Sequence, residues 1–250
     1  MNPIFKTGCV YALAAAAAFT TPAHAYDYEL WLKAELRIDA EGRVEALEWR
    51  ETRDGARLIA DRLEPVVRSW EFEPGRLNGT AAVTDTFLTV QVLGEDQEDG
   101  GVSLSLGKVG TGAVLDTSTP PRYPMREAQN GNSAQLVATL DVSPDGSVRV
   151  ADVQVEASRR GSGKAFVESV REVAVEWKPS LERVGGVPVA ASLRVPVQFC
   201  GPGDLGWCVK QDRERVERLR AKVVSPLPAT GAIALESAVK LLTSVRGTGI

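Results

Sequence analysis

The sequence predicts an α+β protein made of two ββαβ modules, each a helix packed on a small antiparallel sheet, together with a helical C-terminal tail. Three observations support this fold class. The chain has 250 residues, which is enough for two small domains. Residues 32–92 and 136–199 share one pattern of apolar positions. Within each segment the period of that pattern changes from that of a strand to that of a helix and back.

The first 25 residues have the composition of a secretory signal peptide. Lys6 supplies a positive charge, Cys9 to Phe19 form an apolar run, and Ala23-His24-Ala25 has the small residues of a cleavage site. The apolar run is shorter than the roughly 20 residues that a membrane-spanning helix needs. We therefore expect export across the inner membrane, cleavage near Ala25 and a periplasmic mature protein. An uncleaved membrane anchor is the alternative.

Each repeated segment begins with a predicted β-hairpin. Four positions recur with an offset of 104 residues: Leu36, Ile38, Gly42 and Val44 correspond to Leu140, Val142, Gly146 and Val148. Apolar and polar residues alternate before each glycine, which is typical of a half-buried strand. The glycines provide the positive φ that a tight turn requires, so we expect two antiparallel strands around each of them.

A helix is predicted after each hairpin. Five apolar positions recur with an offset of 107 residues: Ile59, Leu63, Val66, Val67 and Trp70 correspond to Phe166, Val170, Val173, Ala174 and Trp177. Their spacing of i, i+4, i+7, i+8 and i+11 places them on one helix face. Pro74 and Pro179 follow the two tryptophans and prevent the helices from continuing. We expect both tryptophans to be core residues.

A last strand closes each module. Thr86–Val92 and Leu193–Phe199 both alternate with a period of two. Between the modules, residues 95–119 begin with an acidic, glycine-rich run, which predicts a flexible connector with at most one short strand at 102–106.

After residue 208, the charged residues 212–220 predict a solvated helix, and the apolar positions from Ile233 to Leu242 predict a second, amphipathic helix. The expected boundaries are a signal peptide at 1–25, a first module at 26–94, a linker at 95–119, a second module at 120–200, and a disulfide loop with a helical tail at 201–250.

Cys200 and Cys208 are the two cysteines outside the predicted signal peptide. An oxidising compartment favours a disulfide between them, and the glycine- and proline-rich residues 201–207 can bend the chain back. The spacing is not that of a CxxC motif, and the single histidine, His24, lies in the signal peptide. We therefore favour a structural disulfide over a redox or metal-binding pair.

The composition argues against catalysis and against nucleic-acid binding. Without a mature histidine, the chain lacks the residues for a Ser-His-Asp triad, a Cys-His pair or a histidine-based zinc site. The formal net charge of −4 does not provide the basic surface that nucleic acid requires. We expect no catalytic residue, no metal, no cofactor and no small-molecule substrate.

Five motifs of the second module resemble the TonB C-terminal domain. They are Pro120-Pro121-Arg122-Tyr123-Pro124, Asp145-Gly146, Trp177-Lys178-Pro179, Gly185-Gly186-Val187-Pro188-Val189 and Val195-Pro196-Val197-Gln198-Phe199. That family passes from a P-x-Y-P start, through a D-G turn and a helix ending in W-x-F/P, to an N-G-x-P-V turn and a V-P-I-x-F strand. The resemblance covers residues 120–200. The first module keeps parts of this pattern but has no Tyr-Pro start.

The resemblance implies a periplasmic domain that binds an extended segment of an outer-membrane transporter or another envelope protein. Such binding adds the segment as a strand to an exposed sheet edge. By analogy the last strand is the capturing edge, and we expect partner-binding residues there and at the start of the domain: Tyr123, Pro124, Leu193, Val195, Val197 and Phe199. A packing role is the alternative for Tyr123.

Two other functions stay open at the level of sequence. The chain is an energy transducer of the TonB type, supporting transmembrane transport, if its first segment stays uncleaved as an anchor. The long proline-rich spacer of such transducers is missing, however. Alternatively, the chain is a structural or assembly factor of the envelope, whose sheets pair with each other or across a homodimer.

Overall fold

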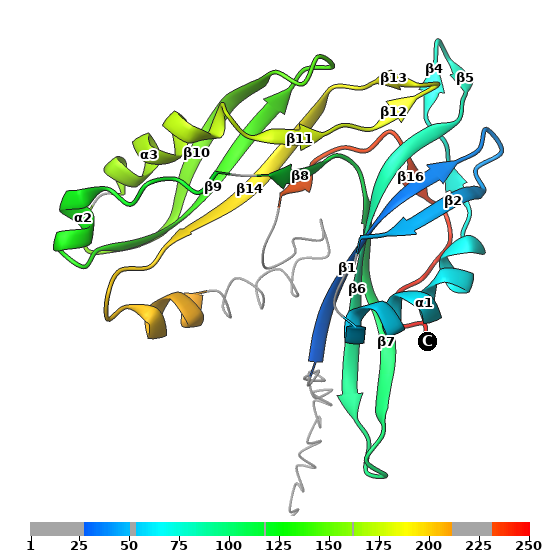
Figure 1. Cartoon of the computed structure of the whole chain (residues 1–250), viewed down its shortest axis with the longest axis horizontal. Coiled ribbons are helices and arrows are strands. Elements are labelled where there is room, and N and C mark those ends of the chain that lie inside the picture. The colour runs from blue at the N-terminus through cyan, green and yellow to red at the C-terminus, as the bar shows by residue number, and fades with distance from the viewer. Residues whose placement is uncertain (1–27, 51–53, 118, 162, 212–231) are drawn as a thin grey trace, which may run out of the picture.

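A computed structural model describes residues 28–50, 54–117, 119–161, 163–211 and 232–250 (Figure 1). The predicted signal peptide and the charged segment 212–220 lie outside these residues. The described part is mixed α and β, with two larger antiparallel sheets. None of its helices has the length and apolar composition that crossing a bilayer requires.

The first sheet is built around β1 (Tyr28–Ile38). This strand pairs with β2 (Val44–Trp49) on one side and with β6 (Thr84–Asp96) on the other. Gly42, in the turn between β1 and β2, has a φ of +86°, and a Cβ there would lie 1.9 Å from the carbonyl oxygen of Phe72. Only glycine fits this turn, because it combines a positive φ with contact between two backbones.

Helix α1 (Asp54–Arg68) covers one face of the first sheet. Its buried residues Ala56, Ala60, Leu63 and Val67 follow the helical period and pack on alternate residues of β1 and β6. Three two-residue strands lie between α1 and β6: β3 (Phe72–Glu73), β4 (Arg76–Leu77) and β5 (Thr80–Ala81). Trp70 is buried in this core, as its sequence position predicts.

The segment 95–119 is not the flexible connector that its composition predicts. Strand β6 continues to Asp96 and pairs with β7 (Val102–Thr111), and β8 (Val114–Thr117) follows. The acidic and glycine residues at 97–101 form only the turn of a long hairpin. A hairpin turn and a linker share the same composition, and the pairing of the strands on either side distinguishes them.

The second sheet has the order β10-β9-β14-β15. It consists of β9 (Ser133–Val142), β10 (Val148–Arg159), β14 (Ala191–Phe199) and β15 (Ile233–Ala234). Helix α3 (Lys164–Ala174) packs on one face, where Phe166, Val170 and Trp177 are buried. The short helix α2 (Met125–Gln129) precedes β9.

Three short strands connect the two halves of the molecule, which are the first half around the first sheet and the second half around the second sheet. They are β11 (Lys178–Ser180), β12 (Arg183–Val184) and β13 (Val187–Pro188). Strand β11 pairs with β8, and β12 pairs with the beginning of β6, where Arg183 lies opposite Asp85. The segment that follows α3 therefore contributes the hairpin of β12 and β13 to the edge of the first sheet.

The C-terminal segment from residue 232 onward is extended, so the predicted amphipathic helix at 233–242 is wrong. Strand β15 pairs with β14, and β16 (Lys240–Leu241) pairs with β3. In Figure 1 this orange-red segment starts beside β8 and crosses to the first sheet. Val239 and Leu241 pack into the first core with a strand period. A few apolar residues fit either period, and pairing with distant strands decides the outcome. Of the described tail, only residues 205–211 are helical.

Candidate functional site

The last strand of the second half, β14, has one fully paired side and one partly open side. On the first side it pairs with β9 along its whole length, from Ala191 to Phe199. On the second side β15 pairs only at Leu193 and Arg194, next to a hydrogen bond of 2.8 Å from the Leu235 N–H to the Ser192 carbonyl. Among the described residues, no strand pairs with this side of residues 195–199.

The backbone of β14 presents alternate residues to the open side. Because the carbonyl of Ser192 points toward β15, the even-numbered residues face outward and the odd-numbered residues face β9. Arg194, Pro196 and Gln198 therefore face the open edge. Pro196 has no N–H, and an outward-facing edge position is where a sheet tolerates proline. Between residues 195 and 199, the edge thus offers one backbone donor, the N–H of Gln198.

The opposite edge of this sheet, β10, is less suited to strand pairing. Its register with β9 shifts twice, between Val150 and Asp152 and between Val155 and Ala157. Such irregularities twist a strand and interrupt its row of hydrogen-bonding groups, which protects an edge against pairing. The outer side of β14 is therefore the better-formed edge of the two.

The side chains of the predicted partner-binding residues on β14 point mainly into the protein. Leu193, Val195 and Phe199 are buried in the second core, and Val197 is half-buried against it. The family resemblance singled them out as partner-binding residues, but their alternation along the strand places them on the inner face. A strand added at this edge would contact the backbone of β14 rather than these side chains.

Tyr123 lies against the last strand, with its ring in edge-on contact with Phe166 and Phe199, both at 5.5 Å between centroids. Its hydroxyl donates to the carbonyl of Asn132. Burial raises the pKa of Tyr123 above the ordinary 10.0, and the negative charges of Asp204 and Glu127 act in the same direction against a lowering hydrogen bond with Ser133. These contacts are those of a packing anchor.

Pro124, predicted with Tyr123, is the N-cap residue of α2 and is half-buried. It has the extended φ and ψ of −62° and 124°. It sets the direction in which the chain enters α2, because its ring fixes φ.

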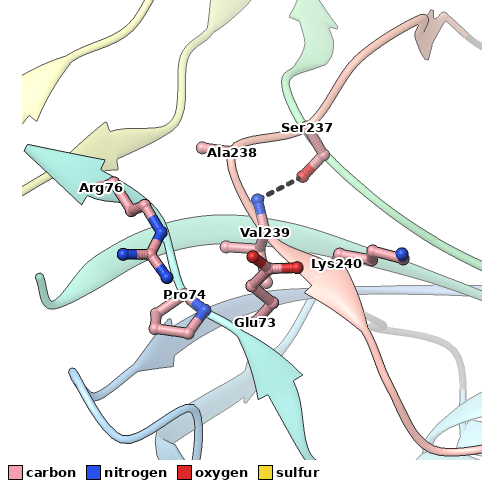
Figure 2. A pocket seen from close by; sticks show the side chains of 7 residues that line it. All are labelled: Glu73, Pro74, Arg76, Ser237, Ala238, Val239 and Lys240. Atoms are coloured by element: carbon pink, nitrogen blue, oxygen red, sulfur yellow. Dashed lines mark hydrogen bonds between the residues drawn. The ribbon is translucent and has the colours of Figure 1, made fainter. Parts of the chain in front are cut away.

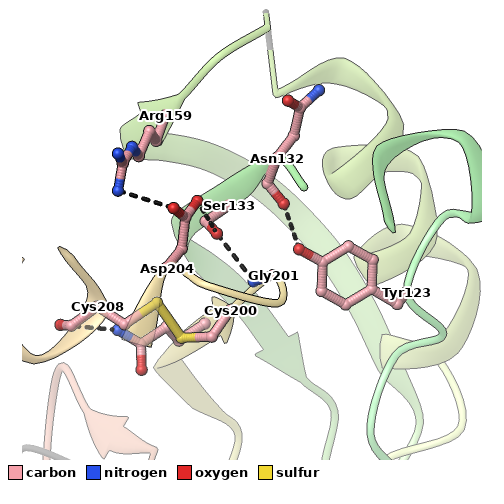
Figure 3. The surroundings of a disulfide bond; sticks show 9 residues. Tyr123, Asn132, Ser133, Arg159, Cys200, Gly201, Asp204 and Cys208 are labelled. Carbon is pink, nitrogen blue, oxygen red and sulfur yellow. Dashed lines mark hydrogen bonds and ion pairs between the residues drawn. A yellow bond between two sulfur atoms is a disulfide. The ribbon is translucent and has the colours of Figure 1, made fainter. Parts of the chain in front are cut away.

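The predicted disulfide between Cys200 and Cys208 is present (Figure 3). Its loop is fastened to the sheet by Asp204, which is 4% exposed. Asp204 accepts a hydrogen bond of 2.9 Å from the Ser133 hydroxyl and forms an ion pair of 2.7 Å with Arg159. The Ser133 hydroxyl in turn accepts a hydrogen bond of 2.9 Å from the Gly201 N–H. The loop is thereby fixed beside the end of β14.

Reducing this disulfide should lower the free energy of unfolding by about 2–3 kcal/mol, because an open loop of this length gives the unfolded chain more conformational entropy. Urea unfolding of the purified chain with and without dithiothreitol measures the change. A Cys200→Ser, Cys208→Ser double variant should match the reduced wild type and should not respond to the reductant. An unchanged unfolding midpoint after complete reduction would contradict the prediction.

The described residues line two surface hollows, and in the first the Ser237 hydroxyl already forms hydrogen bonds with Glu182 and the Val239 N–H. One, of about 310 Å³, lies where the tail crosses β3 and is lined by Glu73, Pro74, Arg76 and residues 237–240 (Figure 2). The other, of about 390 Å³, lies on the first sheet, where Arg37 and Asp85 pair at 2.6 Å. Within the described residues, no group of three or more His, Cys, Asp or Glu side chains could hold a metal ion.

Sequence reasoning missed Glu182, a buried carboxylate at the junction of the two halves. Glu182 is 5% exposed and accepts hydrogen bonds from the Thr86 hydroxyl at 2.5 Å, the Ser237 hydroxyl at 2.8 Å and the Ala238 N–H at 2.7 Å. These donors belong to β6 and to the tail. A single acid in a short connecting segment carries no local signal, because its partners lie 96, 55 and 56 residues away.

Comparison with known proteins identifies the second half. Residues 119–200 match the family model of the Gram-negative bacterial TonB protein C-terminal. Two curated relatives from Xanthomonas campestris pv. campestris, strains B100 and ATCC 33913, are called Protein TonB, and each is 29% identical over 92 residues. The match covers 35% of this chain and 40% of the relatives, so it spans less than half of their length. No solved structure matches the chain. Residues 119–200 therefore form a TonB C-terminal domain.

Proposed function

We propose that this chain is a periplasmic protein-binding module that captures an extended segment of an outer-membrane transporter or another envelope protein by strand addition to β14. The observation that carries the proposal is the outer side of residues 195–199, where no strand pairs within the described part of the chain. Unpaired N–H and C=O groups at a sheet edge are the groups that hold an added strand. The TonB C-terminal match supports a protein partner in the cell envelope.

The arrangement of the first half suggests that the two halves are copies of one module. The orders β2-β1-β6 and β10-β9-β14 both place the first strand of the half in the centre. With the offset of 107 residues, the part of β6 from Leu88 to Val92 corresponds to Val195–Phe199. This part of β6 already carries β7 as an antiparallel neighbour. We infer that the first half is a scaffold and that the second half is the binding unit.

Energy transduction in support of transmembrane transport is the second candidate, since both relatives are named TonB. It requires that the first 25 residues stay attached and anchor the chain. The mature N-terminus, measured by mass spectrometry on the exported protein, decides between the two. Cleavage near Ala25 favours the binding module, and an intact Met1 favours the transducer.

Strand addition predicts a specific effect of proline at Gln198. Gln198→Pro removes the outward N–H in the open part of the edge, so a captured strand loses a backbone hydrogen bond and binding should weaken about 10-fold. The measurement is an amide NMR titration of the exported chain with peptides from the N-terminal segments of outer-membrane transporters of the same organism. In the wild type, shifts should centre on Arg194 and Gln198.

Gln198→Ala is the matched control, because it also loses the side-chain hydrogen bond to the Cys208 carbonyl but keeps the N–H. It should bind like the wild type. Equal affinities of the alanine and proline variants would count against strand addition. Absence of any shift at millimolar peptide would eliminate the binding function itself.

A further inference from the structure

The outer side of β14 is occupied at one end by the protein's own strand. Strand β15 pairs antiparallel with it, Ala234 opposite Leu193 and Ile233 opposite Arg194. Ala232 and Ala234 pack against the second core. The tail thus provides, within the chain, an example of a segment that this edge accepts: extended, antiparallel and with small side chains facing the core.

The place of Ala234 admits only a small side chain. Gly112, in the turn between β7 and β8, has a φ of +130°, and a Cβ built on it would lie 2.5 Å from the Cβ of Ala234. Two carbon atoms that are not bonded do not approach so closely. The backbones at positions 112 and 234 therefore lie as near to each other as a glycine facing an alanine permits. A larger residue opposite Leu193 would meet Gly112 and its neighbours.

The tail is held more firmly elsewhere than at β14. Strand β16 pairs with β3, the Leu242 N–H donates to the Glu71 carbonyl at 2.9 Å, and the Ile250 N–H donates to the Leu104 carbonyl at 3.0 Å. Glu182 binds the tail at Ser237 and Ala238. Strands β15 and β16 are both two residues long, but the residues after β16 add further backbone hydrogen bonds to the first sheet and its neighbours, among them that from the Gly247 N–H to the Leu106 carbonyl. Local opening occurs first where few backbone pairs must break, so β15 can leave β14 while the rest of the tail stays in place.

The open part of the edge is too poor in donors to hold a partner alone. Pro196 lacks an N–H, so residues 195–199 offer only the N–H of Gln198. The next outward N–H groups along the strand belong to Arg194 and Ser192, where β15 and Leu235 lie. A partner strand that forms a full row of backbone hydrogen bonds must therefore take the place of β15.

We propose that β15 is a built-in competitor for the β14 edge. A partner segment displaces it, pairs antiparallel with Ser192–Gln198, and carries a small side chain opposite Leu193. This inference rests on the proposed function of β14 as a binding edge. If β15 competes in this way, the observed affinity for the partner equals the affinity of the open edge multiplied by the fraction of time that β15 is away from it.

The test uses Ala234→Leu in the full exported chain. The leucine cannot fit beside Gly112, so it should release β15 and tighten binding of transporter-derived peptides about 10-fold, as expected if β15 covers the edge roughly nine-tenths of the time.

A second probe is the synthetic peptide of residues 232–237, Ala-Ile-Ala-Leu-Glu-Ser. It should bind the Ala234→Leu chain, and the same peptide with leucine at the position of Ala234 should not. Leu235→Ala is the control, because this side chain is 46% exposed and should leave peptide affinity unchanged.

Hydrogen exchange in the wild-type chain gives a readout that needs no variant. Transporter peptide should speed exchange of the Leu235 N–H and leave that of Leu242 and Ile250 unchanged. If transporter peptides bind wild type and Ala234→Leu equally, with no change at Leu235, the competitor is refuted while the binding function stands. If only the 232–237 peptide binds, and transporter peptides bind neither chain, the proposed function fails and the competitor role fails with it.

Discussion

Replacing Trp177 by alanine should lower the free energy of unfolding by about 3–5 kcal/mol, because it removes the largest side chain of the second core and leaves a cavity. Trp177 is 3% exposed and packs where α3 ends. Its indole N–H donates to the Thr119 carbonyl at 2.8 Å, which ties the start of the TonB C-terminal domain to the helix end. Urea unfolding followed by circular dichroism measures the loss.

Two further substitutions separate packing from hydrogen bonding at this position. Trp177→Phe keeps most of the apolar volume and loses the N–H, so its cost should be well below that of alanine. Val175→Ala changes a side chain that is 54% exposed two residues away, and it should alter stability by less than about 0.5 kcal/mol. A loss under about 1 kcal/mol for Trp177→Ala would show that this core is not packed as described.

Replacing Glu182 by alanine should cost about 2–4 kcal/mol, because it leaves a buried donor of β6 and two half-buried donors of the tail without an acceptor. The Ala238 N–H loses a hydrogen bond of 2.7 Å, and two hydroxyls, of Thr86 and Ser237, lose theirs. Removing the buried carboxylate also relieves the cost of its desolvation, so the net effect falls below the sum of the lost hydrogen bonds. Denaturant unfolding measures the change.

Glu182→Gln is the matched variant, because it keeps the shape and one acceptor oxygen. It should lose less stability than alanine does. The alanine variant should also speed amide exchange at Ala238 and Val239, where the tail passes Glu182. Stability within about 0.5 kcal/mol of wild type would mean that the junction between the halves does not depend on this carboxylate.

The sequence alone determined the local elements and the chemistry of their positions. Glycine turns at Gly42 and Gly146 lie between paired strands, the helices end before Trp70 and Trp177, and Cys200 bonds to Cys208. These features depend on residues close together in the chain, where period and turn chemistry act. The order of the motifs from Tyr123 to Phe199 was specific enough to predict the TonB C-terminal domain that the family comparison identifies.

Only the tertiary structure decided which sheet edges are covered and by what. The compositions of residues 95–119 and 233–242 suit a linker and a helix, yet strands form in both. Strand β7 pairs with the neighbouring β6, whereas β8, β15 and β16 pair with strands far away in the sequence, and these partners satisfy their backbone groups. The same is true of the candidate site. The alternation in β14 places Leu193, Val195 and Phe199 on one face, which the second core covers, whereas only pairing determined that the backbone groups of Arg194, Pro196 and Gln198 face the open edge. A strand's pattern defines its two faces, whereas its two edges are defined by the strands that lie beside it.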